Sequence, residues 1–287
     1  METRIVRGMP ASEYHSFPGA SASRLADFSR SPAHARWRMD HPETPTPAMI
    51  LGAAAHCLIL EPDRFAEQFA VAGRCCAVKK TGERCENPGK ACAGDEWFCG
   101  VHAKGIGGGG DGRTILSPDD AEAVRGMAAA VNAHPAARAL LDRVAQVELS
   151  AFWTDQASGV FCKGRIDLLT KDNVIGDLKT TEDDASPEGF ARSVCKYKYH
   201  VQAIHYLRGL LASMATACDD YQIIAVEKSA PYAVAVYRIN EEQLMLGKNQ
   251  IDEMLTRWAE CEKSATWPAY ADGVVELSLP AWAVRTL

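Results

Sequence analysis

The sequence predicts an α/β (α+β) domain with a central mixed β-sheet that is flanked by helices. Two apolar, β-prone runs at 166–169 and 174–178 are joined by a short polar turn, which favours a hairpin. One strand pattern precedes this hairpin, and a helix pattern followed by another strand comes after it. Together with an apolar helix near residue 50, the core order is helix, strand, two hairpin strands, helix, strand (αβββαβ).

Short helices are expected before residue 42. Ser21 or Ser23 can cap a first helix, and Ser31-Pro32 is a typical start for a second helix through Trp37. Arginines make this stretch basic. A solvated helix face is the preferred interpretation of these charges, with phosphate contact as the alternative.

The strongest helix of the first third spans residues 46–62. Its Ala, Met, Ile and Leu residues tolerate or favour helix, and Glu61-Pro62 ends it. A histidine in an apolar stripe is usually a core residue, so the pattern alone leaves His56 as either a core residue or a site residue. The stripe at helical spacing consists of Met49, Ala53, His56 and Leu60.

Residues 72–113 have the composition of an insertion into a domain formed by residues 1–71 and 114–287. The segment has few aliphatic side chains, so a metal ion would have to supply the stability that a core cannot. Its C-x9-C…C-x2-H pattern gives a tetrahedral Cys₃His ligand set that suits structural Zn²⁺. The proposed ligands are Cys75, Cys85, Cys99 and His102.

Three features of this zinc hypothesis stay open. Cys76 could replace Cys75 as a ligand, and Cys92 is a spare cysteine. The glycine-rich run 105–112 would tether the motif flexibly. A disordered linker with incidental cysteines and an iron–sulfur cluster are the alternatives, and the C-x2-H ending favours zinc over the cluster.

Two alanine-rich helices and a strand follow the insertion. Ser117-Pro118 is a typical helix start, and residues 121–131 and 135–141 are expected to form scaffold helices. Residues 146–154 alternate as a strand does, with Glu148 on the less apolar face. Glu148 is a candidate for a third carboxylate in a metal site, and a solvent-facing position is nearly as well supported.

Three charged residues interrupt the apolar strands of the hairpin. Asp177 and Lys179 are two residues apart, so they project from the same face of the second strand, and Asp167 can reach that face from the first. Two carboxylates suit Mg²⁺ or Mn²⁺, and a lysine beside them can orient or deprotonate a water. We therefore place the chemistry here, with an ordinary surface salt bridge as the alternative.

An amphipathic helix follows at residues 199–214, after a short helix that starts at Ser186-Pro187. Gln202 and Tyr206 are four residues apart and share one face of the long helix. Two strands at 221–227 and 233–239 and a helix at 241–263 complete the chain. A local basic patch before the long helix consists of Arg192, Lys196 and Lys198.

Length, net charge and composition restrict the number of domains and the class of protein. The 287 residues can form one large domain with an insertion, and the net charge of −6 argues against a non-specific nucleic-acid coat. A nuclease is still compatible with this charge, since binding depends on where the basic residues lie. No apolar run is long enough to span a membrane and no signal-peptide core is present, so we expect a cytoplasmic protein whose 10 cysteines are thiols or metal ligands.

The segments GRIDLL (164–169) and IGDLKTT (175–181) resemble the PD-(D/E)XK nucleases, and within them the RecE-type exonucleases of phages (exonuclease VIII and its relatives). Ile166 departs from the proline of the superfamily name. The resemblance extends to the G-x-x-x-H…L-E-P arrangement of 52–62, to Q-x-x-x-Y at 202–206 and to the C-terminal segment. It covers nearly the whole chain except residues 72–113. Those residues resemble small zinc motifs through Ala77, Lys80, Gly82, Asn87 and Phe98.

The resemblance implies a restriction-endonuclease-like core and a Mg²⁺-dependent 5′-to-3′ exonuclease that acts on duplex DNA ends. It implies that His56 and Glu148 join Asp167, Asp177 and the Leu178 backbone carbonyl around the metal ion. Gln202 and Tyr206 would contact the DNA. Expected partners are double-stranded DNA, a single-strand annealing protein and further copies of the chain in a ring.

Two other functions fit the same residues. One is a structure-specific endonuclease of the same fold, which only a comparison of circular and linear DNA would distinguish from an exonuclease. The other is a catalytically silent module that binds DNA or a partner in recombination. The presence of Asp167, Asp177 and Lys179 argues against the silent module.

Overall fold

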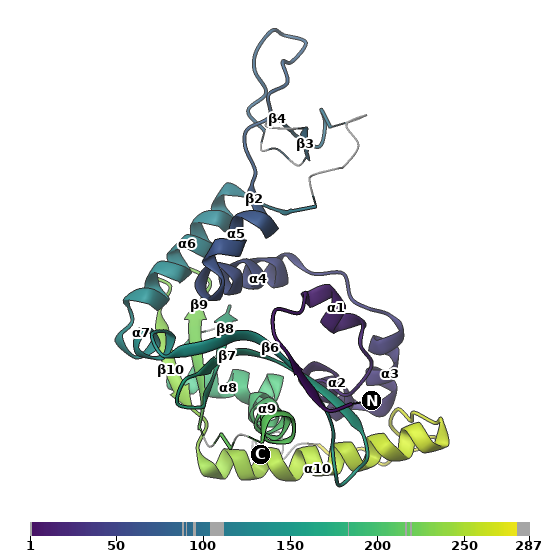
Figure 1. The fold of residues 1–287 in the computed structure, drawn as a ribbon. Helices are drawn as coiled ribbons and strands as arrows, with labels where there is room; N and C mark the ends of the chain where they lie inside the picture. Colours follow the sequence, from purple (N-terminus) through teal and green to yellow (C-terminus); the bar gives the residue numbers. More distant parts are fainter. Residues whose placement is uncertain are drawn as a thin grey trace, which may run out of the picture.

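A mixed six-stranded sheet forms the centre of the computed structural model, and helices cover both of its faces (Figure 1). The strand order is β1-β6-β7-β8-β9-β10, with β8 and β9 parallel and the other neighbours antiparallel. The predicted mixed sheet is therefore confirmed. The structure describes residues 2–87, 89, 91–93, 96–103, 112–182, 184–215, 217–218 and 220–279.

The predicted hairpin is β7 and β8, which are longer than the sequence pattern indicated. The turn between them is at 171–173, as predicted, and Asn173 adopts a positive φ of 60°, which asparagine tolerates better than most residues. The strands of the central sheet are β1 (Arg4–Val6), β6 (Val144–Thr154), β7 (Phe161–Thr170), β8 (Val174–Thr181), β9 (Asp220–Glu227) and β10 (Val234–Arg238).

One face of the sheet is covered by α4 (Pro47–Leu60), α6 (Pro118–Ala133) and α7 (Pro135–Leu141). Buried aliphatic side chains from these helices pack on Leu168, Leu178 and Ile224 of the strands. Because Leu178 is fully buried between the layers, the strand segment that carries Asp177 and Lys179 is held firmly under α4.

The other face is covered mainly by α9 (Tyr199–Met214), against which α10 (Glu241–Ser264) packs. Two further helices, α2 (Ala22–Arg30) and α3 (Pro32–Asp40), lie at this side, and Phe28 of α2 packs against Trp258 of α10 with ring centres 5.2 Å apart. With both faces covered, β6 carries consecutive buried residues from 149 to 153 instead of the alternation that one exposed face would give.

The predicted helix starts are present in the structure. Ser21, rather than Ser23, caps α2, and Ser31, Ser117 and Ser186 cap α3, α6 and α8 (Pro187–Tyr197), each by accepting a backbone N–H. In α3, α6 and α8 a proline at the first helical position fixes a φ that suits a helix, which explains why these three starts could be predicted from the sequence.

Short elements near the N-terminus were not predicted. β1 is a strand because it pairs with β6, and α1 (Ala11–Ser16) and α5 (Pro62–Gln68) are too short for a periodic pattern. α5 leads into β2 (Phe69–Val71), which pairs in parallel with β5 (Thr114–Leu116). Because the two strands are parallel, Val71 pairs with Leu116 and Thr114 pairs with Phe69, so residues 72–113 begin and end at opposite ends of this three-residue ladder.

The part of residues 72–113 that the structure describes holds one further hairpin, β3 (Ala91–Ala93) with β4 (Glu96–Phe98). Residues 104–111, which include most of the predicted glycine-rich tether, lie outside the described residues, as does the Cys92 side chain. Among the helices of the described ranges, none has the length and apolar content to cross a membrane.

Candidate active site

A cavity of about 840 Å³ opens between α4, the end of β8 and α8. His56 and Lys179 both line it, so the two residues that sequence analysis took from distant segments face one space. Its remaining wall includes His15, Met49, Gly52, Thr180, Tyr197 and Lys228.

Three residues of the α4 stripe, Met49, Ala53 and His56, line this cavity, whereas Leu60 packs against the core. Of the two alternatives for His56, the site residue is therefore the one that the structure supports. Met49 is 50% exposed, whereas the core side of α4 is formed by Ala54, Ala55, Cys57 and Ile59. A Cβ on Gly52 would lie 3.1 Å from the Thr180 hydroxyl, so glycine permits α4 to approach β8 this closely. The close approach brings His56 to the hairpin.

Asp177 and Lys179 form an ion pair at the cavity, with Asp177 Oδ2 and Lys179 Nζ 2.5 Å apart. Asp177 is only 1% exposed, whereas Lys179 reaches the cavity surface. Burial alone would lower the pKa of Lys179, but the charges of Asp177 and Asp167 outweigh it and raise that pKa. The lysine is therefore held as an ammonium group beside two carboxylates.

Asp167 lies across the hairpin and accepts a hydrogen bond from the Leu178 N–H at 2.8 Å. Burial raises the pKa of Asp167 to about 7, and the nearby charge of Asp177 acts in the same direction while His56 opposes it. A cation bound beside Asp167 would offset this burial and favour the ionised carboxylate.

His56 bridges the two sides of this site. Its Nε2 donates to the Leu178 carbonyl at 2.6 Å and lies 3.5 Å from Asp167 Oδ2. Burial would lower the pKa of His56, but Asp167 and Glu148 outweigh it and raise the pKa to about 9. The imidazole therefore lies between the carboxylates of Asp167 and Glu148, and not in the hydrophobic core.

Glu148 approaches from β6, where its neighbours Val147 and Leu149 pair with Leu168 and Ile166 of β7, and its Oε1 lies 3.9 Å from His56 Nδ1. Its φ of 50° interrupts the regular strand, an unusual backbone for a non-glycine residue and one that recurs at functional sites. The solvent-facing alternative for Glu148 is wrong, because its side chain points into this cluster and pairs with Arg165.

Two basic residues of β7 were missed by the sequence analysis. Arg165 pairs with Glu148 and donates to the Met9 carbonyl at 2.8 Å. Lys163 is buried and donates to the carbonyls of Tyr14 and Phe17 at 2.9 and 2.6 Å, which fixes the α1 segment beside the site. The available signal was the period-two pattern of Lys163, Arg165 and Asp167 along one strand.

The donor atoms of this cluster fit a divalent cation. One ligand atom each from His56, Glu148 and Asp167 lie within 4.8 Å of one another. The Leu178 carbonyl oxygen accepts a hydrogen bond from the same imidazole. Carboxylate and carbonyl oxygens are the ligands that Mg²⁺ and Mn²⁺ prefer. Asp177 is turned toward Lys179 and Gln202, so its role as a metal ligand stays a prediction.

Residues 21–277 match the family described as "PDDEXK-like domain of unknown function (DUF3799)". The chain belongs to this family. The match covers every residue of the cluster as well as residues 72–113. It confirms the predicted PD-(D/E)XK fold and supports a nuclease, whereas the RecE-type specificity is a narrower prediction that it does not test. The sequence matches no curated protein.

A solved structure agrees with this family assignment. The crystal structure of a "putative exonuclease" from Eubacterium rectale is similar with a TM-score of 0.60 and 11% sequence identity, covering 98% of this chain and 99% of that chain. At this identity the likeness shows the fold alone. The structure of SSO0001 covers 50% of this chain and 66% of that one, with 18% identity and a TM-score of 0.28, and carries no argument.

Within this PDDEXK-like site, Gln202 and Tyr206 support the hairpin from α9. Gln202 donates to Asp177 Oδ1 at 2.6 Å and to the Tyr221 hydroxyl at 3.1 Å. Tyr206 is 9% exposed and packs closely over Gly164 of β7. Neither side chain lines the cavity, so the predicted DNA contact of Gln202 and Tyr206 stays a prediction. The structure shows instead that Gln202 supports Asp177 through a hydrogen bond.

The predicted basic patch lies on and just after α8. Lys196 lines the cavity, with its Nζ 4.9 Å from the centre of the Tyr197 ring. Arg192 is exposed and 3.9 Å from Asp184, and Lys198 ends α8 with a left-handed φ of 59°. Lys196 is therefore the member of the patch that is placed to meet a substrate in the cavity.

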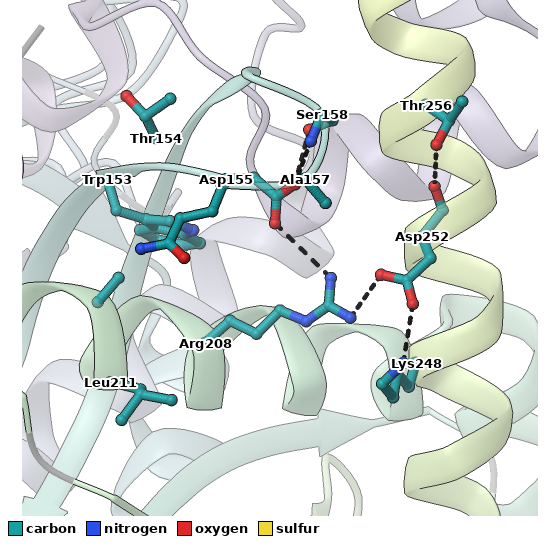
Figure 2. A pocket seen from close by; sticks show the side chains of 12 residues that line it. Trp153, Thr154, Asp155, Ala157, Ser158, Arg208, Leu211, Lys248, Asp252 and Thr256 are labelled. Atoms are coloured by element: carbon teal, nitrogen blue, oxygen red, sulfur yellow. Dashed lines mark hydrogen bonds and ion pairs between the residues drawn. The ribbon is translucent and has the colours of Figure 1, made fainter.

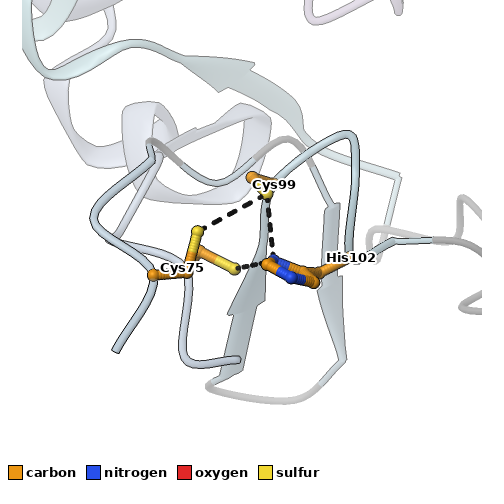
Figure 3. Close-up of side chains that lie close together, drawn as sticks. Cys75, Cys99 and His102 are labelled. Atoms are coloured by element: carbon orange, nitrogen blue, oxygen red, sulfur yellow. Dashed lines mark hydrogen bonds between the residues drawn. The ribbon is translucent and has the colours of Figure 1, made fainter. Parts of the chain in front are cut away.

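The four predicted zinc ligands come together in the insertion. Figure 3 shows three of them, Cys75, Cys99 and His102, with their side chains directed toward one another. His102 Nδ1 lies 3.4 Å from Cys75 Sγ and 3.3 Å from Cys99 Sγ, and Cys85 Sγ lies 3.9 Å from Cys99 Sγ. Tetrahedral zinc with Zn–S near 2.3 Å places its ligand atoms about 3.5–3.8 Å apart, which is close to the observed 3.3, 3.4 and 3.9 Å. Cys75 rather than Cys76 belongs to the cluster.

A second cavity, of about 550 Å³, lies between α9, α10 and the β6–β7 turn (Figure 2). Arg208 at its floor lies 2.5 Å from Asp252 and 3.8 Å from Asp155, and Lys248 pairs with Asp252 at 3.1 Å. These charges neutralise one another, and no residue of the PDDEXK-like cluster lines this cavity. The chemistry therefore belongs to the first cavity.

Proposed function

We propose that this protein is a Mg²⁺- or Mn²⁺-dependent deoxyribonuclease of the RecE type, which degrades duplex DNA from its ends in the 5′-to-3′ direction. The observation that carries the proposal is the convergence of Asp167, His56 and the Leu178 carbonyl beside Lys179 at one cavity. This arrangement combines oxygen and nitrogen ligands for a cation with an ammonium group that is held in place. Phosphodiester hydrolysis needs little else from a protein.

A divalent cation bound by Asp167, His56 and the Leu178 carbonyl, with Asp177 and Glu148 as further ligands, would neutralise the charge that develops on the phosphate and the leaving 3′ oxygen. Lys179 is a positioning group for the attacking water. Its ammonium has three donors, and one is directed to Asp177, so the others can hold a water at the cavity. Gln202 holds the second oxygen of Asp177 and thereby fixes the direction of the lysine.

Duplexes labelled at the 5′ or the 3′ end, compared with a closed circle, test this proposal. With Mg²⁺, the linear duplex should lose nucleotides from its 5′ ends while the circle stays intact. Cleavage of the circle would support the alternative, a structure-specific endonuclease. A protein that binds DNA but cleaves neither substrate would support the silent recombination module.

The same proposal includes the cellular setting. A RecE-type exonuclease would work in the cytoplasm as a ring of identical subunits, next to an annealing protein that coats the single strand it exposes. The ring is tested by the mass of the protein in solution, and the partner by co-purification of the two proteins.

His56→Ala should abolish most of the Mg²⁺-supported cleavage, by about 10²-fold or more, because a metal ligand and its charge environment are lost. Mn²⁺ is expected to restore part of the rate. The protein should stay folded, since the His56 ring lies at the cavity rather than in the core. The measurements are cleavage rates and thermal melts across a titration of each metal.

His205→Ala is the matched control for this experiment. His205 is 1% exposed and its Nε2 donates to the Lys163 carbonyl at 3.0 Å, so its loss should lower the melting temperature without changing the metal preference. If His56→Ala behaves as His205→Ala does, His56 is a structural residue and the metal assignment fails.

We also propose that Cys75, Cys85, Cys99 and His102 hold a structural Zn²⁺. The ligand set is full, with no open position for a water, which is typical of structural sites. A hydrogen bond from the His102 backbone lowers the pKa of Cys99 to about 6, so thiolate is available for the metal. The folded insertion would then act as an accessory that engages DNA or a partner.

A further inference from the structure

The cavity beside Lys179 has two large apolar side chains in its wall that the proposed hydrolysis does not use. Tyr197, the last residue of α8, is 49% exposed, and Met49, near the start of α4, is 50% exposed. Apolar surface of this kind within a cavity, as opposed to an open surface, is typical of a ligand site.

The Tyr197 ring belongs to a continuous series of groups that begins at the catalytic lysine. Lys179 Nζ lies 5.0 Å from the centre of the Tyr199 ring, and the Tyr199 ring stacks on Tyr197 with centres 5.7 Å apart and planes at 23°. Lys196 places its ammonium group 4.9 Å from the Tyr197 ring centre. An aromatic face with cations beside it is the combination that binds the base and phosphate of single-stranded nucleic acid.

The size and charge of the cavity agree with this ligand. Its volume of about 840 Å³ is within the range of about 300–1,000 Å³ that is typical of small-ligand sites, which suits one or two nucleotides and not a stacked duplex. Three lysines line it, at positions 179, 196 and 228. Glu182, which is also in the lining, is paired with Lys228 at 3.1 Å, and Lys179 is paired with Asp177. Each lysine ammonium group has three N–H donors, so these lysines keep further donors for a phosphate.

We propose that Tyr197 is a stacking platform for an unpaired base, and that the site takes a separated strand end rather than an intact base pair. This inference rests on the proposed function, because it specifies the substrate of the same cavity. The nucleotide whose phosphate is placed at Lys179 would lay its base on the Tyr197 ring. A duplex end would therefore have to fray before it is cut.

The direct test is the fluorescence of 2-aminopurine at the terminal position of an oligonucleotide, mixed with the wild-type protein in buffer without added Mg²⁺ or Mn²⁺. Stacking on Tyr197 should quench this probe. Tyr197→Ala should remove the quench and weaken binding by about 5- to 100-fold, the range expected for one base–aromatic stack, and Tyr197→Phe should keep both. Single-stranded, overhanging and blunt-ended oligonucleotides are compared, and affinity should fall in that order.

Trp37→Ala is the matched control, because Trp37 is also an exposed aromatic residue (65%) but lies outside the cavity, on α3. A second control replaces the terminal base with an abasic site, for which wild type and Tyr197→Ala should bind equally. If Tyr197→Ala weakens normal and abasic ends to the same extent, or if Tyr197→Phe behaves as Tyr197→Ala does, the platform is refuted.

The outcome for the platform is separable from the outcome for hydrolysis. A Tyr197-dependent quench in a protein that never cleaves DNA with Mg²⁺ or Mn²⁺ would reject the nuclease proposal and leave the platform standing. Efficient cleavage of a duplex whose terminal pairs are covalently crosslinked, with no quench of the probe, would reject the platform and leave the nuclease.

Discussion

Lys179→Ala should reduce DNA cleavage by about 10²- to 10⁴-fold, because the group that holds the attacking water is lost. The expected signature is a fall in kcat with little change in the affinity for metal, since Lys179 is not a ligand. The measurement is single-turnover cleavage of a labelled linear duplex with saturating Mg²⁺, together with metal binding by calorimetry.

Stability has to be measured beside activity in this variant. Asp177 is almost fully buried, and without Lys179 its negative charge loses its ion pair while the hydrogen bond from Gln202 remains, which destabilises the folded state. Lys179→Gln retains a donor for Asp177 and should melt closer to wild type while staying inactive. If Lys179→Gln is folded and cleaves near the wild-type rate, the assignment of Lys179 is wrong.

Lys171→Ala is the matched control for the lost charge. Lys171 lies in the exposed β7–β8 turn, outside the cavity, and belongs to the same hairpin. Its removal should leave kcat unchanged. Equal losses from Lys171→Ala and Lys179→Ala would mean that total charge, and not the position of one ammonium group, determines the rate.

The hairpin was predictable because local chemistry determines it. A polar turn between two β-prone runs sets the register, and a period of two brings Asp177 and Lys179 to one side of the strand. The serine-proline helix starts were predictable for the same reason, since a cap depends on the three residues that follow it. Both patterns are local, so they predict the hairpin and the helix starts whatever the rest of the chain packs against them.

Other features depend on contacts between distant segments, which no local pattern encodes. The stripe of α4 with Met49 and His56 has the composition of a core face, yet α4 packs through its alanine face and leaves this stripe at the cavity. Glu148 turns toward His56 because its backbone adopts a left-handed φ opposite Asp167. Sequence alternation predicted only a regular strand there.

For Gln202, the sequence pattern identified the residue but did not predict its structural role. Its place four residues before Tyr206 marked the face of α9 that meets the hairpin. The hydrogen-bond partners of the Gln202 amide depend on how α9 packs on the sheet. This packing places the amide beside Asp177 and Tyr221. Burying the Asp177 carboxylate without a hydrogen-bond partner would cost free energy, which explains why a donor such as Gln202 lies beside it.

The insertion should contain one Zn²⁺ per chain when the protein is purified without added metal, as measured by elemental analysis. Binding of structural zinc contributes about 10–16 kcal/mol in small zinc domains, and the insertion has little else to hold it together. Its buried hydrophobic cluster consists of the cysteines themselves, Cys75, Cys85 and Cys99. Loss of the ion should therefore unfold the described part of residues 72–113.

Cys99→Ser should lose the zinc and expose residues 72–113 to limited proteolysis, while the nuclease domain keeps its main thermal transition. Cys76→Ser is the matched control, because Cys76 is next to a ligand but is not part of the cluster. It should retain the zinc. A wild-type protein without zinc would refute the metal site.

Replacement of residues 74–112 by a short Gly/Ser linker separates the role of the insertion from that of the active site. The flanking strands β2 and β5 are parallel and three residues long, so the linker has to run back only over this short length, which a flexible Gly/Ser linker of about ten residues can span. Metal-dependent cleavage should continue, and DNA binding should weaken with a flatter salt dependence, because the basic residues Lys79, Lys80 and Arg84 are removed. The deletion leaves the cluster at His56, Asp167 and Lys179 unchanged. If the deletion variant is well folded but has lost all cleavage, the insertion is therefore part of the catalytic machinery.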